Sequence, residues 1–137
     1  MSVSDAVPKP TPAPAIEPAR QRGKTFIADD VVSSIARMAA EQIDGVHQIG
    51  SSTFRALISR LGRNHGIEAE VGMKEAAIDI EIIVEFGYPI REVAESLRQE
   101  VISSVERMTG RKVVEVNVSV IDVHIPKQEQ RPRRQLE

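Results

Sequence analysis

The sequence AIDIEIIVEFGYP, residues 77–89, decides how this chain folds. Apolar side chains alternate with acidic ones over 77–86, as in Ile80 and Glu81, and a period of two residues predicts a strand with one buried and one wet face. The break at Gly87-Tyr88-Pro89 ends this strand and begins a helix, because proline suits the first helical turn, where its missing N–H is not needed. The segment therefore predicts a strand that leads directly into a helix.

Residues 90–125 predict a second helix and a second strand. Apolar residues recur at helical spacing from Ile90 to Met108, and Gly110 ends this helix, because glycine readily adopts the left-handed conformation found at helix ends. Alternation resumes in Lys112–Ile125, where one face should consist of Val114, Val116, Val118 and Val120. If the two strands are parallel, the strand–helix–strand unit should cross over with a right hand.

The segment before this unit predicts a weak strand and a long helix. Residues 24–27 suit an edge strand that leads into the helix, with Asp29 and Asp30 as its N-cap and first-turn acid. Asp44-Gly45 closes the helix, whose apolar residues are Val31, Val32, Ile35, Met38, Ala39 and Ile43. Val46–Ile49 then forms either a short strand or an extended connection.

Two further elements complete the expected fold. Thr53–Arg63 carries one apolar stripe and predicts a short extra helix. Ile67–Gly72 and the strand from Ala77 should form a hairpin. The expected fold class is therefore α+β, with a small mixed sheet of three to four strands and two main amphipathic helices on one of its faces.

The chain of 137 residues has room for one folded domain between two tails. Residues 1–23 are rich in proline and predict a disordered tail, because they cannot bury enough apolar surface to offset chain entropy. Residues 24–125 should form the α+β domain, and residues 126–137 a polar, basic tail. The domain contains 11 Lys and Arg against 16 Asp and Glu, and this acidic balance is a poor footprint for a nucleic-acid-binding domain.

The composition excludes several classes of function. There is no Cys, which excludes disulfides, thiolate zinc sites and thiol catalysis. Aromatic residues make up 3% of the chain and leave few rings on which bases or sugars could stack. No apolar run is long enough to cross a bilayer, and the N-terminus lacks a signal-peptide pattern, so we expect a cytoplasmic protein.

The residues show no motif for catalysis, a cofactor or a metal. His47, His65 and His124 are scattered, and none lies at helical spacing from another. The fold could bring two of them together, but we interpret all three as surface or turn residues. We also interpret the acids of 77–86 as a solvated strand face. We therefore expect no catalytic residue, no cofactor, no metal ion and no small-molecule substrate.

Four pieces of sequence carry a family resemblance: Gly23-Lys24-Thr25-Phe26-Ile27-Ala28, Ile43-Asp44-Gly45-Val46, Phe86-Gly87-Tyr88-Pro89-Ile90 and Met108-Thr109-Gly110. In this order they resemble the alkaline shock protein family, which comprises general-stress and envelope stress response proteins of Gram-positive bacteria. The resemblance covers residues 23–125. It implies a small cytoplasmic, non-enzymatic protein, which in some members a separate membrane-anchored partner holds at the inner face of the cell membrane. The family has no established catalytic residues to carry over.

We therefore expect a stress response protein that acts by binding, as a scaffold that self-associates, docks on a membrane-anchored partner or supports cell-envelope homeostasis. The candidate interface residues interrupt the polar face of the sheet and are Ile83, Ile121 and Val123. The candidate contacts to an anionic partner are Arg55, Arg60, Arg63, Arg131, Arg133 and Arg134. The last three of these arginines could contribute a weak electrostatic contact to anionic lipid.

The alternative function is an RNA-binding module that uses the basic region 55–74. A KH module clamps the nucleic-acid backbone with a Gly-x-x-Gly loop, and the turn at Gly62–Gly66 resembles such a loop with its glycines one residue too far apart. The acidic balance of the domain makes this the less favoured hypothesis.

Overall fold

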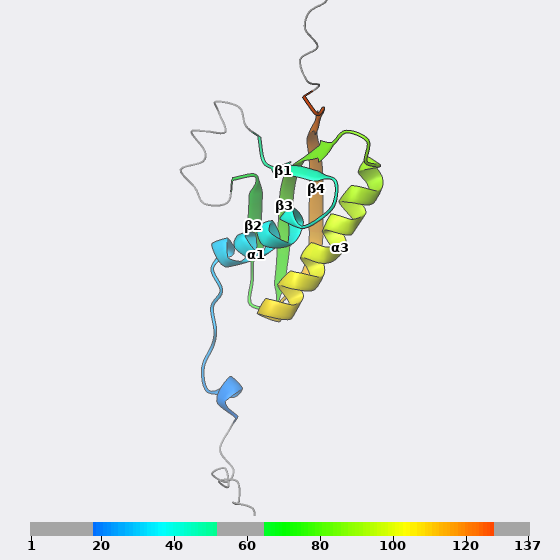
Figure 1. Cartoon of the computed structure of the whole chain (residues 1–137). Coiled ribbons are helices and arrows are strands. Elements are labelled where there is room, and N and C mark those ends of the chain that lie inside the picture. The colour runs from blue at the N-terminus through cyan, green and yellow to red at the C-terminus, as the bar shows by residue number, and fades with distance from the viewer. Residues whose placement is uncertain (1–17, 52–64, 128–137) are drawn as a thin grey trace, which may run out of the picture.

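The computed structural model describes residues 18–51 and 65–127 and shows a sheet with two helices on one of its faces (Figure 1). The expected α+β fold class is confirmed. The expected short helix at Thr53–Arg63 lies outside the described residues. In chain order the elements are η1 (Ala19–Gln21), α1 (Asp29–Glu41), β1 (Val46–Ile49), β2 (Ile67–Val71), β3 (Glu75–Glu85), α3 (Ile90–Thr109) and β4 (Lys112–His124).

The sheet is built around β3, which pairs with the three other strands of the described residues. β2 pairs with its first half and β1 with its second half, both antiparallel, as in Ile67↔Ile80 and Val46↔Val84. β4 runs parallel to β3 along its whole length. The sheet is therefore mixed. The expected hairpin of β2 and β3 and the expected strand–helix–strand unit are both confirmed, and Val46–Ile49 is a strand.

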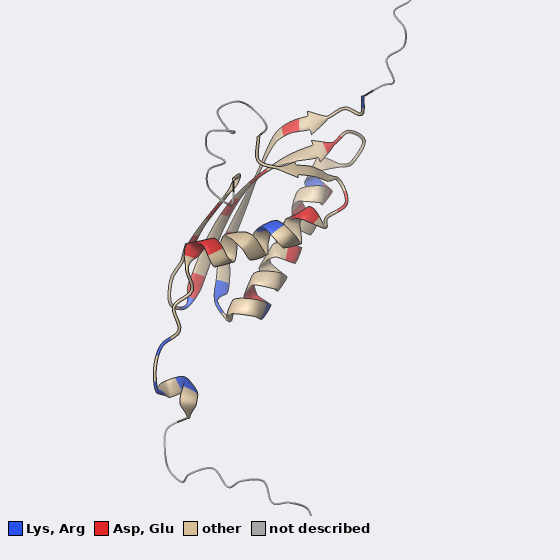
Figure 2. Cartoon of the chain, turned by 60° about the vertical axis from the view of Figure 1, so that its left-hand side comes forward, with Lys and Arg blue, Asp and Glu red and all other residues tan. Residues whose placement is uncertain are grey.

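The core lies between β3 and the two helices, which cover the same face of the sheet (Figure 2). The inward side chains of β3 are at most 1% exposed, and they are Ile78, Ile80, Ile82 and Val84. Fully burying an isoleucine side chain stabilises the fold by about 1.5–3 kcal/mol. The residues of α3 that meet them are Val93, Leu97, Val101 and Val105. Alternation in β3 and helical spacing in α3 therefore predicted these eight core residues.

The buried side of α1 differs from the expected one. Small residues, Ala36 and Ala40, are fully buried beside Val32, whereas Val31 is 46% and Met38 61% exposed. Short side chains let the helix backbone approach the sheet closely, so these alanines take the most deeply packed positions. In α3 the expected core residue Met108 is likewise 66% exposed. Met38 and Met108 both border a groove between α1 and α3 and do not lie in the core.

Two β-bulges in β4 change the expected alternation. Ala76 pairs with Val113 but Ala77 pairs with Glu115, so Val114 is an extra residue and is 50% exposed while Val113 is buried. A second bulge inserts Ile121 before Asp122, which pairs with Ile83. Each inserted residue shifts all later side chains by one position. The expected assignment of Val116, Val118 and Val120 to the helix-covered face therefore holds only between the two bulges.

The second bulge also corrects the expected position of Val123. This residue pairs with Val84, whose side chain is buried in the core, so Val123 lies on the helix-covered side of the sheet. Strict alternation predicts the opposite face for Val123, together with Ile121.

The entry to α1 also differs from expectation. Residues 24–27 form no strand; instead the guanidinium of Arg111 donates a hydrogen bond to the carbonyl of Thr25 at 2.9 Å. The N-cap of α1 is Ala28 rather than Asp29. The Asp29 carboxylate instead accepts a hydrogen bond from the backbone N–H of Val71 at 3.1 Å, which ties the start of α1 to the end of β2.

Candidate functional site

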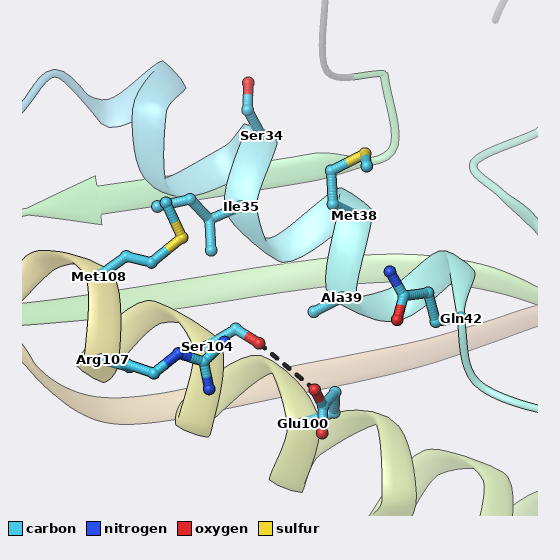
Figure 3. Close-up of a pocket in the computed structure, with 9 residues that line it drawn as sticks. All are labelled: Ser34, Ile35, Met38, Ala39, Gln42, Glu100, Ser104, Arg107 and Met108. Carbon is cyan, nitrogen blue, oxygen red and sulfur yellow. Dashed lines mark hydrogen bonds between the residues drawn. The ribbon is translucent and has the colours of Figure 1, made fainter.

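A groove of about 330 Å³ lies between α1 and α3 on the surface of the helix layer (Figure 3). Ile35 and Ala39 of α1 supply its apolar part, and the exposed Met38 and Met108 border it. Methionine is unbranched and polarizable, so such a surface adapts to the shape of an apolar partner. The polar side chains of the groove are Ser34, Gln42, Glu100, Ser104 and Arg107. The groove is therefore suited to receive apolar side chains between polar rims.

The second candidate surface is the outer edge of β4. Within residues 18–51 and 65–127, β4 pairs with β3 alone, and an unpaired edge presents backbone N–H and C=O groups to another strand. Side chains of α3 occupy its first part: Glu106 accepts from the Val113 N–H at 2.9 Å, and Arg98 donates to the Val116 carbonyl at 3.0 Å. Further along, Val118 is only half-buried although it lies on the helix-covered face.

The face of the sheet that the helices leave uncovered is acidic, and acidic positions recur along the strands in Figure 2. By register, the acids of this face are Glu68, Glu70, Asp79, Glu81, Glu85, Glu115 and Asp122. The Asn117 amide donates to Asp79 at 2.9 Å and to Glu115 at 2.6 Å and so bridges two of them. This face repels phosphate groups and does not favour a nucleic acid or an anionic lipid surface.

The predicted interface residues occupy different environments. Ile83 lies on the acidic face between Gln48 and Asp122, yet it is only 8% exposed and stands outside the main hydrophobic cluster. Ile121, in the bulge, is 41% exposed. Val123 is half-buried on the other side of the sheet. Their role in an interface therefore stays a prediction, and Ile121 is the most accessible of the three.

All six arginines predicted to contact an anionic partner lie outside the described residues. The same holds for the turn from Gly62 as far as residue 64. Of the basic region 55–74, the structure places Lys74, which is exposed in the β2–β3 turn. The RNA-binding alternative therefore stays a prediction.

Two histidines that look scattered in the sequence meet in the structure. His47 of β1 and His124 of β4 stack face to face, with ring centroids 3.7 Å apart, beside Glu85 at the end of β3. His65 lies elsewhere, and its Nε2 is 2.9 Å from the carbonyl of Ser51. Helical spacing could not reveal this cluster, because its members come from three strands.

Among the described residues, no helix combines the length and the apolar character that a membrane span requires.

Several curated relatives match most of the chain. A stress response regulator gls24 homolog of Streptococcus pyogenes serotype M3 is 32% identical over 111 residues, which are 78% of this chain and 62% of that relative. The uncharacterized protein YqhY of Bacillus subtilis (strain 168) is 30% identical over 104 residues, which are 74% of this chain and 77% of that relative. The chain thus spans less than two thirds of the length of the gls24 homolog.

Solved structures of MamM CTD variants are also similar in part. One covers 70% of this chain and 81% of its own, with a TM-score of 0.47 and 17% identity. Another covers 68% of this chain and 93% of its own, with a TM-score of 0.44 and 18% identity. These values are too low to bear on function.

A family model matches residues 17–125, and its description gives a cell envelope-related function. The match contains every described helix and strand from η1 to β4. Its description concerns the cell envelope and the name of the gls24 homolog concerns stress response, and neither describes an enzyme family. The chain therefore belongs to the alkaline shock protein 23 family, as the order of its sequence motifs indicated.

Proposed function

We propose that this protein is a non-enzymatic scaffold of the envelope stress response, which self-associates and docks on a membrane-anchored partner at the inner face of the cell membrane. The observation that carries the proposal is the outer edge of β4, which no other described strand covers. The part of this edge that follows the contacts of Glu106 and Arg98 can pair with a strand of another chain, and an identical β4 from a second copy is always available.

The sequence of β4 is compatible with pairing to itself. Residues 116–120 read Val-Asn-Val-Ser-Val, which is nearly symmetric about Val118. In an antiparallel pair with a two-fold axis at Val118, Val116 faces Val120 on one side of the sheet and Asn117 faces Ser119 on the other. The first pair is apolar and the second can hydrogen-bond, and no two like charges face each other within this segment. Pairing would also bury the half-exposed Val118.

The groove between α1 and α3 supplies the surface for the partner. It lies on the helix layer, so a second copy at the β4 edge leaves it accessible. We assign it to an amphipathic helix of the membrane-anchored protein, since a groove with apolar walls and polar rims receives the apolar stripe of such a helix. Glu100 and Arg107, which lie on the same wall, offer charges of both signs to the helix's polar flanks.

Sedimentation velocity over a concentration series tests self-association. We expect a dimer for the wild type and a monomer for Val118→Lys. Residue 118 of one copy lies opposite residue 118 of the other, so the two new lysine charges would repel each other. The matched control is Val114→Lys, which adds the same charge to β4 at an exposed residue outside the symmetric segment. Ser119→Lys, at an exposed position opposite Asn117, repeats the test without touching the helix-covered face. A wild-type monomer throughout the series, or dimers that survive both test variants, would refute this mode of assembly.

Capture from gently lysed native cells tests the groove. We expect an integral membrane protein to co-purify with the wild type regardless of nuclease and to be lost with Met38→Glu combined with Met108→Glu. Met73→Glu, in the turn between β2 and β3 and 49% exposed, is the control and should retain it. If the membrane protein still co-purifies with the double variant, the groove is not its binding surface. Capture that depends on RNA and disappears with Arg60→Glu plus Arg63→Glu supports the RNA-binding alternative instead.

A further inference from the structure

We propose that His47, Glu85 and His124 form a binding site for one divalent transition-metal ion of the zinc type. The candidate ligand atoms of the three side chains all lie within 4.8 Å of one another. Nδ1 of His47 is 2.5 Å and Nδ1 of His124 3.0 Å from the same oxygen, Oε1 of Glu85. Two imidazole nitrogens therefore lie beside one carboxylate oxygen, and these are the donor types of a three-ligand zinc site.

The distances are close to those that a metal ion requires. Zinc binds imidazole nitrogen and carboxylate oxygen at about 2.0–2.1 Å, which separates tetrahedral ligand atoms by about 3.3 Å. The Nδ1 atoms of His47 and His124 must therefore move away from Oε1 of Glu85 by only about 0.3–0.8 Å. The two stacked rings have nearly parallel planes, and an imidazole lone pair lies in its ring plane, so at least one ring must also turn for both nitrogens to bind one ion. Rotation about side-chain torsions supplies both movements without moving the strands.

Bulges in β1 and β4 place both histidine side chains next to Glu85. His47 is the extra residue of a bulge in β1, where Val46 pairs with Val84 and Gln48 with Ile83. His124 pairs with Glu85 because the bulge at Ile121 shifts the last residues of β4 by one position; without it, His124 would face the core. Bulges commonly redirect a side chain at a functional site.

The backbone around the cluster is fixed by hydrogen bonds. The Glu85 N–H donates to the Gly45 carbonyl at 2.8 Å, and the Phe86 N–H donates to the His124 carbonyl at 2.9 Å. The side chains of His47, Glu85 and His124 are 32%, 31% and 39% exposed. The backbone that carries Glu85 and His124 is thus held in place while solvent reaches the side chains, which leaves room for a fourth ligand such as water.

The ligand set selects the class of metal. Two imidazoles and one carboxylate suit Zn²⁺, Ni²⁺, Co²⁺ or Cu²⁺, whereas Mg²⁺ and Ca²⁺ prefer oxygen ligands alone. The nearby acidic face of the sheet raises the local concentration of cations. A bound ion would tie the end of β3 to β1 on one side and to β4 on the other, and so stabilise the folded chain.

Titration calorimetry of the untagged chain with Zn²⁺ tests the site. We expect one Zn²⁺ per chain and a higher Tm when Zn²⁺ is present. His47→Gln, His124→Gln and Glu85→Gln should each weaken the affinity by about 10-fold or more. His65→Gln removes the remaining histidine of the chain and should leave the affinity unchanged. Mg²⁺ should neither compete with Zn²⁺ nor raise Tm.

Nitrogen-15 spectra of the imidazoles in the wild type supply a readout that does not depend on a variant folding. On addition of Zn²⁺, Nδ1 of His47 and His124 should take the signature of a metal-bound nitrogen, while His65 stays unchanged. The proposal is overturned if Zn²⁺ does not bind, if it binds equally well to the His47 and His124 variants, or if only His65 responds.

Discussion

The substitution Gly45→Ala should destabilise the fold by an amount that the structure lets us divide into two parts. Gly45 follows α1, and its φ of 97° lies in the left-handed region. For a residue with a side chain this conformation costs about 1–2 kcal/mol. The new methyl group would also lie 2.7 Å from Cγ2 of Val93 and 2.9 Å from Cδ2 of Tyr88.

The steric part is large because Val93 cannot easily move. This valine is 4% exposed within the core, and overpacking a well-filled core costs about 1–3 kcal/mol. The two parts together predict a loss of about 2–5 kcal/mol in the free energy of unfolding for Gly45→Ala.

Gly87→Ala is the matched control. Gly87 has nearly the same φ, 102°, but a methyl group there meets no atom within 4 Å. We therefore expect a loss of about 1–2 kcal/mol from the backbone alone. Both variants change the unfolded chain in the same way, so the difference between them measures the clash.

Urea unfolding followed by circular dichroism gives both free energies. If Gly45→Ala lowers the free energy of unfolding by no more than Gly87→Ala does, at equal m-values, then Gly45 is not closely packed against Val93. A wild-type-like stability for both variants would refute the left-handed conformation as well.

Three further predictions concern single contacts. Leu97→Ala empties a fully buried position in α3 and should lower the free energy of unfolding by about 2–5 kcal/mol in the same assay. Thr109→Val removes a buried hydroxyl that donates to a carbonyl of α3 at 2.7 Å and accepts from the Arg111 N–H at 3.1 Å, so urea unfolding should show a loss of about 1–3 kcal/mol. Arg111→Ala removes the 2.9 Å hydrogen bond that anchors the Thr25 carbonyl. Limited trypsin digestion should then cut after Lys24 faster than in the wild type, and an unchanged rate would contradict the anchoring of this segment by Arg111.

The sequence predicted the central strand–helix–strand unit well, because local patterns specify its elements. The expected strand 77–86 is observed as Glu75–Glu85, and the helix that follows Pro89 ends before Gly110, whose φ is 70°. Inward alternation and helical spacing follow from the geometry of one element alone. The family resemblance likewise needs no structure, and the family model confirmed the family.

The candidate surfaces depended on contacts that local patterns do not contain. The groove exists because α1 packs through Ala36 and Ala40, which leaves Met38 exposed beside α3. The open edge of β4 follows from the pairing order of the strands.

What the sequence by itself determined is the order of the main helices and strands and the core-facing residues of β3 and of most of α3. What only the tertiary structure decided is where the register of β4 slips, and hence which side Val123 and His124 face. The physical reason is that a bulge is fixed by pairing with a neighbouring strand, while alternation assumes one residue for each position on that neighbour. The meeting of His47 with His124 depends on that pairing and on the packing of distant strands around Glu85.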